Sequence, residues 1–526
     1  MVSESFYQLS MCAEDPEELR LAADAFERRL RDMLPRIVSP ADFEGWFDAT
    51  VGRPPCCPMV LTGMLLLQSR YGLPDDEVVA RARRDRAFRY ALHLDGREQP
   101  PAVSTFRRHR SRLRERLGDD FLHRRVLALA QSEGLVDDVE LQAQDSTNTE
   151  CRGAIIDTFN LIAAGIGRVV RTVARVVGCA PESLATRWSM SRYLARSIKG
   201  QAAIDWSSEK ARNALLTEEI RDAEQLPELV AALGLQLPPE VDEALELLQT
   251  VAHQDVERLE DGTYRIARGT CKGRVVSITD PEARHGRKSR SRTITGFKTH
   301  VQGTICSQFV TGIAITDAGV HDAQPSPKLI EQSAEVGLKP QEVVADAAYG
   351  TGANLRACAS QDVAMCTKLP SSSHDGFTKR DFDIDLEAMT ATCPRGHTTG
   401  EYSLVKVGGG SDERVPSFKF PRTACQHCPL ASRCGSAPRK GQPRRLKLSA
   451  YEEELQRAKA FNASPRAGEV LRRRSAVERL ISHLVRMGMR HARFFGMHLV
   501  QYQAFLTAAA YNLQRVFTLT RSAAAP

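Results

Sequence analysis

Three acidic residues stand where a fold could bring them together. Asp145 closes a short run in which apolar residues alternate, so positions 139–145 predict a strand that ends on a carboxylate before Ser, Thr and Asn break the run. Asp346 ends a second apolar strand, EVVAD, ahead of a Gly-containing turn and a helix. Glu478 lies on the helical segment RRRSAVERLISHLVRMGMR. A single carboxylate after a strand is usually only a cap or turn residue, so their meaning depends on whether they converge.

Converging carboxylates would suit a divalent metal. Hard Mg²⁺ prefers carboxylate oxygens and keeps water at its other positions. Two such ions could activate a nucleophile and stabilise the leaving oxygen of a phosphodiester, and Mn²⁺ could substitute for Mg²⁺. The residue types therefore predict metal-dependent phosphodiester chemistry at Asp145, Asp346 and Glu478.

The segments that must position these acids alternate between strand and helix. Helical patterning covers the first 135 residues and returns from 154 to about 265. Three runs rich in β-branched residues then predict an antiparallel meander, namely RVVSITD (Arg274–Asp280), TITGFKTHVQGTI and FVTGIAIT. Two helices alternate with the strands EVVAD and VAMCTKL, and the block from Tyr451 to about Thr520 predicts long amphipathic helix.

Basic side chains gather in two segments. The helix VSTFRRHRSRLRERL carries Arg107, Arg108 and Arg110 with few acidic residues among them, which favours contact with DNA phosphates over a merely solvated surface. The loop PEARHGRKSRSR contains Arg287 and Lys288. That loop could hold a phosphate backbone beside the carboxylates or simply be flexible.

Four cysteines cluster in a polar segment. Cys393, Cys425, Cys428 and Cys434 lie within about forty residues and include one Cys-x₂-Cys pair, which gives enough thiolates for tetrahedral Zn²⁺. A small segment with few apolar residues needs such a staple, so a structural zinc ion is expected. A metal-free relic of the site, or cysteines that act only as small apolar residues, are the alternatives.

Composition excludes several classes of protein. The chain has 526 residues, of which 42% are hydrophobic and 26% charged, as in soluble proteins with several domains. The formal net charge of +7 suits a polyanionic partner, although a solvated basic surface would give the same value. No secretory signal opens the sequence and no run approaches the ~18 apolar residues of a membrane span. We therefore expect a cytoplasmic protein, without a membrane partner, whose thirteen cysteines are reduced thiols.

The order of the motifs resembles that of bacterial insertion-sequence DDE transposases. GRPPCCPMVLTGMLLLQSRYGLPDDEVVARARRDRAFRYALHL, followed by STFRRHRSRL, resembles the N-terminal helical domain of one large branch. Successive blocks of the catalytic domain of that branch resemble QDST, SITDPEARHGRKS, TGFKTHV, VHDAQ, ADAAYGTGANL and AVERLISHLVRMGMRHARFFG. The CP…CQHCPLASRC cluster recurs in the same branch. The resemblance covers nearly the whole chain, and the order of the blocks is what makes it specific.

The resemblance implies a role for individual residues. Asp145, Asp346 and Glu478 match the catalytic triad that holds two Mg²⁺ ions, while Asp280 and Asp322 match acidic positions that we expect to be supporting.

A signature of Tyr, Arg, Glu and Lys surrounds the Glu in many relatives. Arg474 keeps its Arg, four residues before Glu478, but Leu471 and Val485 occupy the Tyr and Lys positions, so hairpin formation does not carry over. The resemblance implies DNA contact by Arg474 and by Lys298 of the TGFKTHV block, and Arg486 could replace the missing Lys.

The implied fold is an α/β catalytic core of ribonuclease H-like type, a mixed sheet flanked by helices. We expect a helical domain for DNA binding and dimerisation, two parts of the core separated by a helical insertion, a Cys-rich zinc-binding insertion, and C-terminal helices that complete the core. The corresponding ranges are 1–135, 136–153, 154–265, 266–369, 370–450 and 451–526.

The implied function is transposition in bacterial cytoplasm, close to the nucleoid. The protein would bind terminal inverted repeats in double-stranded DNA, pair two ends as a homodimer, cleave strands and join them to target DNA. Two alternatives stay open at this point, a catalytically inactive DNA-binding regulator derived from a transposase and a metal nuclease without strand transfer.

Overall fold

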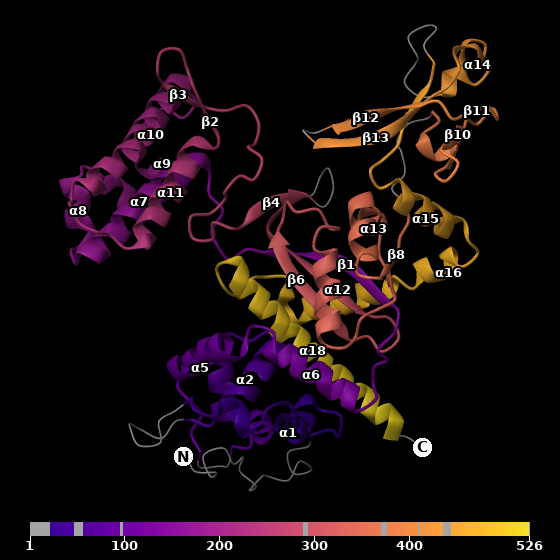
Figure 1. The fold of residues 1–526 in the computed structure, drawn as a ribbon. Helices are drawn as coiled ribbons and strands as arrows, with labels where there is room; N and C mark the ends of the chain where they lie inside the picture. The colour runs from indigo at the N-terminus through magenta and orange to yellow at the C-terminus, as the bar shows by residue number, and fades with distance from the viewer. Residues whose placement is uncertain are drawn as a thin grey trace.

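A central sheet organises the protein. The computed structural model describes residues 21–46, 56–94, 98–287, 293–369, 376–408, 411–434 and 443–524. Figure 1 shows the N-terminal helices on one side of the sheet, and the long C-terminal helix α18 runs between these helices and the sheet. A helical body and a small β module project from the other side, well apart from each other (Figure 1).

The sheet is mixed and has six strands. Its order is β4-β5-β1-β7-β8, with β6 also paired to β5. β1 runs antiparallel to β5, which in turn is antiparallel to β4 and β6, whereas β7 and β8 run parallel to β1. The strands are β1 (Gln142–Glu150), β4 (Arg284–Arg287), β5 (Thr293–Thr304), β6 (Val310–Asp317), β7 (Glu342–Val344) and β8 (Ala364–Cys366). A mixed α/β architecture was therefore correctly expected.

β1 differs from the predicted strand over 139–145. It begins at Gln142 and continues through Asp145 to Glu150, because every residue of this stretch pairs with β5. On its other edge, β1 has a much shorter partner, because β7 pairs only with Gln142 and Ala143. Val139, placed on the buried face by its spacing, lies outside the strand and is 57% exposed. Asp145 thus sits in mid-strand, just beyond the point where β1 loses its neighbour on the β7 side.

Another predicted strand is absent. Arg274–Asp280 has no strand conformation, although Val276 and Ser277 are buried. The strand that precedes β5 is instead β4, at Arg284–Arg287, inside the segment that was expected to be a basic loop. β4 forms because it pairs antiparallel with the first four residues of β5.

Helices cover both faces of the sheet. Ala143, Val301 and Ile313 pack in one apolar cluster with residues of α17 and α18. Val343 and Met365 pack in a second cluster with residues of α12, α13 and α15. The sheet-flanking helices are α12 (Ser326–Glu335), α13 (Gly352–Ala359), α15 (Glu452–Ala463), α17 (Ser475–Leu484) and α18 (Met497–Ala524).

The described part of the first 135 residues is helical, as expected. Its elements are α1 (Phe26–Ile37), the 3₁₀ turn η2 (Pro40–Phe43), α2 (Pro58–Tyr71), α3 (Asp75–Arg84), α4 (Arg86–Ala91), α5 (Val103–Leu117) and α6 (Phe121–Ser132). Proline at the first position of α2 and Gly72 in the left-handed region (φ 65°) set the ends of that helix. α2 is buried almost all round because it packs among the other helices and against α18.

The helical body between β1 and β4 has an apolar core of its own. The core is built mainly by α7, α10 and α11. Its helical elements are α7 (Thr158–Val177), α8 (Pro181–Arg187), η3 (Ser191–Leu194), α9 (Ile198–Gln201), α10 (Glu209–Ala231) and α11 (Pro239–His253). A small hairpin of β2 (Val256–Arg258) and β3 (Tyr264–Ile266), which the sequence had not indicated, closes the body.

The β module contains two three-stranded sheets, β11-β10-β9 and β12-β13-β14. Phe382, Phe418, Phe420 and Leu446 form its small apolar core. Its elements are η5 (Lys379–Asp381), β9 (Asp383–Asp385), β10 (Thr390–Thr392), β11 (Thr398–Thr399), β12 (Tyr402–Gly408), β13 (Ser411–Lys419), α14 (Arg422–Gln426), η6 (Ala431–Arg433) and β14 (Arg445–Lys447).

The C-terminal block is helical but broken, where one long amphipathic stretch was expected. α15 is followed by the short α16 (Ala467–Arg472), α17, and the π-helical turn η7 (Val485–Met489) before α18. Pro465 lies between α15 and α16, and Gly488 adopts a φ of 98°, which favours glycine and turns the chain away from α17. None of the helices in the described ranges is both long and apolar enough to span a membrane.

Candidate active site

A cavity of about 580 Å³ opens where β1 loses its pairing with β7. Asp145, Asp346 and Glu478 all line it. The first comes from β1, the second from the turn after β7, and the third from α17. The other lining residues are Ser146, Thr147, Asn148, Arg287, Lys298, Asp322, Ile481, Ser482, Val485 and Arg490. Three acids separated by hundreds of residues thus share one cavity.

Asp145 is partly buried, and both of its carboxylate oxygens accept hydrogen bonds. Its Oδ1 accepts a hydrogen bond from the backbone N–H of Ser146 at 2.8 Å, and its Oδ2 accepts one from Nη1 of Arg474 at 3.0 Å. Burial raises the pKa of Asp145, and the charges of Asp346 and Glu478 add to this effect. The Ser146 bond and the Arg474 charge oppose the increase without cancelling it.

Asp346 is held by the turn that follows β7. It caps the 3₁₀ turn η4 (Ala347–Tyr349), and its Oδ1 accepts a hydrogen bond from the backbone N–H of Ala348 at 2.8 Å. Its backbone oxygen accepts a bond from the Thr367 hydroxyl. These contacts fix the carboxylate at the carboxyl end of β7, where the sequence had predicted it.

Arg474 links the other two acids. It precedes α17, and its Nη2 contacts Oε1 of Glu478 at 2.6 Å while Nη1 contacts Asp145. The contact to Glu478 has the i, i+4 spacing expected from the sequence, but the contact to Asp145 could not be foreseen, because it depends on how α17 docks against β1. One guanidinium therefore bridges carboxylates from two distant elements.

Asp322 supports the cavity through Lys298. Its Oδ1 lies 2.9 Å from Nζ of Lys298, which also donates to the backbone oxygen of Val320 at 2.7 Å. Burial acts to raise the pKa of Asp322, but the hydrogen bond and charge of Lys298 outweigh it and leave that pKa below its usual range. Lys298 is thus committed to Asp322 instead of standing as a free cation.

Asp280, the second acid expected to be supporting, lies outside the cavity lining. It is fully buried, and its Oδ1 accepts a hydrogen bond from the backbone N–H of Gly496 at 3.1 Å. Burial raises the pKa of Asp280. A Cβ on Gly153 would lie 2.6 Å from the Cβ of Asp280, so the segment after β1 passes directly over it. Asp280 joins that segment to the start of α18.

The acids of the cavity attract positive charge. The guanidinium of Arg474 stands between two of them, Asp145 and Glu478. Carboxylate oxygens are the ligands that Mg²⁺ prefers. In the described ranges, however, no group of three or more His, Cys, Asp or Glu side chains has an arrangement that could hold a metal ion. Asp145 and Glu478 are thus ion-paired through Arg474 in this structure.

Only some of the basic residues predicted to contact DNA line the cavity. Arg287 and Lys298 line it, whereas Arg486 is exposed on η7 and is not among the lining residues. Arg490, four residues later, lines it instead. Lys288 lies outside the described residues. At the signature positions, Val485 lines the cavity and Leu471 packs against the apolar core.

The basic helix of the N-terminal part is partly neutralised. Arg110 donates two hydrogen bonds to Asp75, at 2.6 and 3.0 Å, and only 12% of its side chain is exposed. Arg107 also bonds Asp75, at 2.8 Å, although most of its side chain is exposed, and Arg108 is exposed. The expectation that Arg110 faces DNA disagrees with this geometry, because Asp75, from the neighbouring helix α3, holds its guanidinium.

Replacing Asp75 by Asn should lower the free energy of unfolding by roughly 3 kcal/mol, because it leaves Arg110 shielded without its partner. The hydrogen bonds from Arg110, Gln68 and Arg107 outweigh burial and hold the pKa of Asp75 well below its usual range. The pair therefore stabilises the fold above pH ~4 and loses this contribution as the pH falls further. Urea unfolding at pH 7 measures the loss, with exposed Asp76→Asn as the control; equal stability of the two variants would contradict the assignment.

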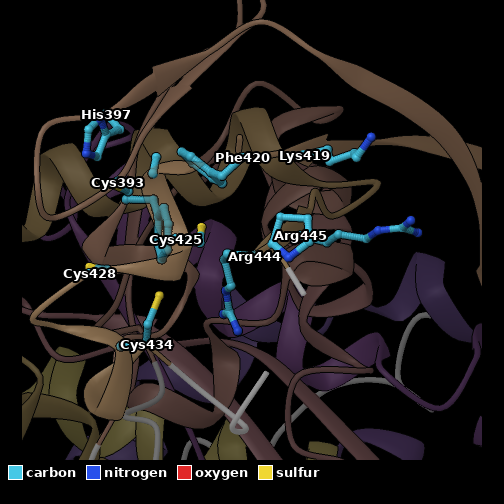
Figure 2. Close-up of a pocket in the computed structure, with 13 residues that line it drawn as sticks. Cys393, His397, Lys419, Phe420, Cys425, Cys428, Cys434, Arg444 and Arg445 are labelled. Carbon is cyan, nitrogen blue, oxygen red and sulfur yellow. The ribbon is translucent and has the colours of Figure 1, made fainter. Parts of the chain in front are cut away.

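The four cysteines of the β module lie around a second cavity of about 470 Å³ (Figure 2). Cys393, Cys425, Cys428 and Cys434 line it together with His397. Burial raises the pKa of the Cys434 thiol, although the nearby Arg444 charge opposes the increase. These are the four cysteines that the sequence proposed as zinc ligands. Their arrangement in the described residues is not one that could hold a metal ion, so the predicted structural zinc gains no support.

The fold and the first cavity define a mixed α/β protein that gathers carboxylates from separate elements, as enzymes of DNA phosphodiester chemistry require. Comparison with family models points to the same kind of protein. Residues 392–517 match a transposase DDE domain, and residues 15–112 match a transposase domain (DUF772). No curated protein and no solved structure matches the chain.

The two matches support assignment of the chain to the insertion-sequence DDE transposases that its sequence resembles. DDE transposases in general use divalent metal ions. The DDE match contains Glu478 and the four cysteines, whereas Asp145 and Asp346 lie outside it. Any catalytic role for those two aspartates is therefore argued from their position in the cavity and not from the family match.

Proposed function

We propose that this protein is an active DDE transposase that binds the terminal inverted repeats of its element, cleaves DNA strands and joins them to target DNA. The observation that carries the proposal is the shared cavity of Asp145, Asp346 and Glu478, in which Arg474 bridges two of the acids. The transposase family matches support the same conclusion.

We infer a ribonuclease H-like core from the strand order. β6, β5 and β1 are antiparallel neighbours, and β7 and β8 continue the sheet parallel to β1. The helical body is inserted between β1 and β4, and the β module between β8 and α15. On this basis we propose the division into 1–135, 136–153, 154–265, 266–369, 370–450 and 451–526.

Asp145, Asp346 and Glu478 would hold two Mg²⁺ ions, or Mn²⁺ in their place, which supply an activated water and neutralise charge on the phosphodiester. Arg474 would keep Asp145 and Glu478 in register before the ions bind, because it contacts both. Arg287 would add positive charge along the path of the strand, and Lys298, which is paired with Asp322, would lie beside it.

The chemistry would have two displacements. A water attacks the phosphorus at the element end, the bond to the 3′ oxygen breaks, and that oxygen takes a proton to become a 3′-OH. This hydroxyl then attacks a phosphodiester of the target, loses its proton and displaces the 3′ oxygen of the target strand. A homodimer that pairs two ends would perform both steps, and the exposed Arg107 and Arg108 would contact phosphates of the double-stranded ends.

A strand-transfer assay tests this function. Purified protein is incubated with a labelled, pre-cleaved element end and a supercoiled target plasmid in Mg²⁺. We expect labelled DNA joined to the plasmid, and no joining when the end carries a 3′-dideoxynucleotide. Nicking without joining would instead indicate a metal nuclease, and binding without either reaction would indicate an inactive DNA-binding regulator.

A further inference from the structure

We propose that Arg490 binds a backbone phosphate of the DNA strand in the acidic cavity and thereby positions the strand for cleavage. This inference rests on the proposed function, because it assumes that DNA enters the cavity. No feature of the sequence singled out Arg490. Its assignment comes from how the chain holds it and from which other cations at the cavity are already engaged.

The backbone at Arg490 is fixed to the end of β1. Gly488 turns the chain out of η7, and the backbone oxygen of Arg490 then accepts a hydrogen bond from the N–H of Glu150 at 2.8 Å. Ala492 donates to the backbone oxygen of Glu150 at 2.9 Å. The Thr149 hydroxyl donates to the backbone oxygen of Met489 at the same distance. Three hydrogen bonds around a single residue leave Arg490 little freedom to move away from the strand.

The side chain runs back along β1 to the cavity. Nη1 of Arg490 donates to Oγ1 of Thr147 and to the backbone oxygen of Asn148, both at 3.2 Å. Both acceptors are neutral, and in the part of the chain that the structure describes no carboxylate pairs with Arg490. A guanidinium has five N–H donors, so several remain for a ligand.

The other cations of the cavity differ from Arg490. Arg474 is bound to two carboxylates, and Lys298 is bound to Asp322. Arg287 lines the cavity without a carboxylate partner among the described residues, but it is an exposed residue at the end of β4. Arg490 is therefore the cation that is both rigidly placed and uncompensated.

A phosphodiester is the ligand that this arrangement favours. The cavity is lined by four carboxylates, which repel an entering strand unless a nearby cation offsets them. Arginine binds phosphate oxygens through paired N–H donors, with more directional contact than lysine provides. Because its Nη1 is tied to β1, the guanidinium has a fixed orientation, which suits a contact that sets the register of a backbone.

A methylphosphonate scan tests the contact without requiring catalysis. Element-end DNA carries a single neutral methylphosphonate at each position around the cleavage site, and binding is measured in EDTA. At one position the neutral linkage should weaken wild-type binding by about tenfold. Arg490→Met should bind unmodified DNA about tenfold more weakly than the wild type does. Placing the methylphosphonate at that same position should weaken binding by this variant by less than about a further twofold. Arg490→Lys should recover part of the affinity.

Arg473→Met is the matched control, because Arg473 is an exposed arginine after α16 that pairs with Glu469 and lies outside the cavity lining. It should keep the full methylphosphonate effect. Thermal melting checks folding, since Arg490 also bonds β1, and if Arg490→Met unfolds, Arg490→Lys and Arg490→Gln are scanned instead. The proposal is overturned if, at every position, the methylphosphonate lowers the DNA affinity of the Arg490 variants as much as it lowers that of the wild type. In that case, strand transfer by the wild type would still support the proposed function. A wild type that neither binds nor joins element ends would contradict both the role of Arg490 and the proposed function.

Discussion

Replacing Asp346 by Ala should abolish DNA cleavage and leave binding to element ends within about twofold. Asp346 is one of the four acids that line the cavity, and its oxygens have no basic partner in the described residues whose charge would be stranded by the substitution. Even indirect partners of metal ligands contribute about 10–100-fold to activity, so the loss of a direct ligand should exceed 100-fold. Single-turnover cleavage of a labelled end in Mg²⁺ measures the effect, and filter binding in EDTA measures affinity.

Asp362→Ala is the control for this experiment. Asp362 lies in the turn between α13 and β8, where 93% of its side chain is exposed, and it is outside the cavity lining. The variant should cleave at the wild-type rate. Cleavage by Asp346→Ala at a comparable rate, with both proteins folded, would contradict the assignment of Asp346 as a catalytic residue.

Replacing Arg474 by Met should slow cleavage by about 10–100-fold at saturating Mg²⁺. The guanidinium is the cation that contacts both Asp145 and Glu478, so its removal leaves two neighbouring carboxylates without the group that orients them. Methionine keeps much of the length of the side chain, and Arg474 is partly exposed, so the fold should survive. Single-turnover rates over a range of Mg²⁺ concentrations distinguish a slower reaction from weaker ion binding.

The chain supplies a close control in Arg473. This arginine precedes Arg474 and pairs with Glu469 on the exposed side of α16, at 2.6 Å. Surface pairs of this kind contribute little to stability, so Arg473→Met should behave as wild type. If Arg473→Met and Arg474→Met were equally impaired, general disturbance of this helix would explain the loss better than the bridge does.

The sequence was sufficient to locate the three acids because each lies in a recognisable local context. An apolar run precedes Asp145 and Asp346, and helical periodicity surrounds Glu478. Local context did not define the strand that carries Asp145. The polar stretch after it is extended only because β5 pairs with it, and such tertiary pairing overrides local preference.

Contacts between distant elements were the part that could not be predicted. Nothing in the basic helix reveals that Asp75 engages Arg110, because the two residues meet only when α3 packs on α5. Arg490 escaped notice for the same reason, since its place at the cavity depends on the turn at Gly488 and on the docking of residues 489–492 against β1. Spacing along one helix, in contrast, did predict the contact between Arg474 and Glu478.

The most direct measurement is cleavage of a labelled DNA end of the element by the wild-type protein, in Mg²⁺ and in EDTA, with the product ends mapped. If Asp145, Asp346 and Glu478 act through divalent ions as we propose, cleavage should occur in Mg²⁺ and not in EDTA, at the element boundary, with a free 3′-OH on the product. Cleavage that persists in EDTA, or tight binding with no cleavage in Mg²⁺ or Mn²⁺, would contradict a metal-dependent DDE transposase built on Asp145, Asp346 and Glu478.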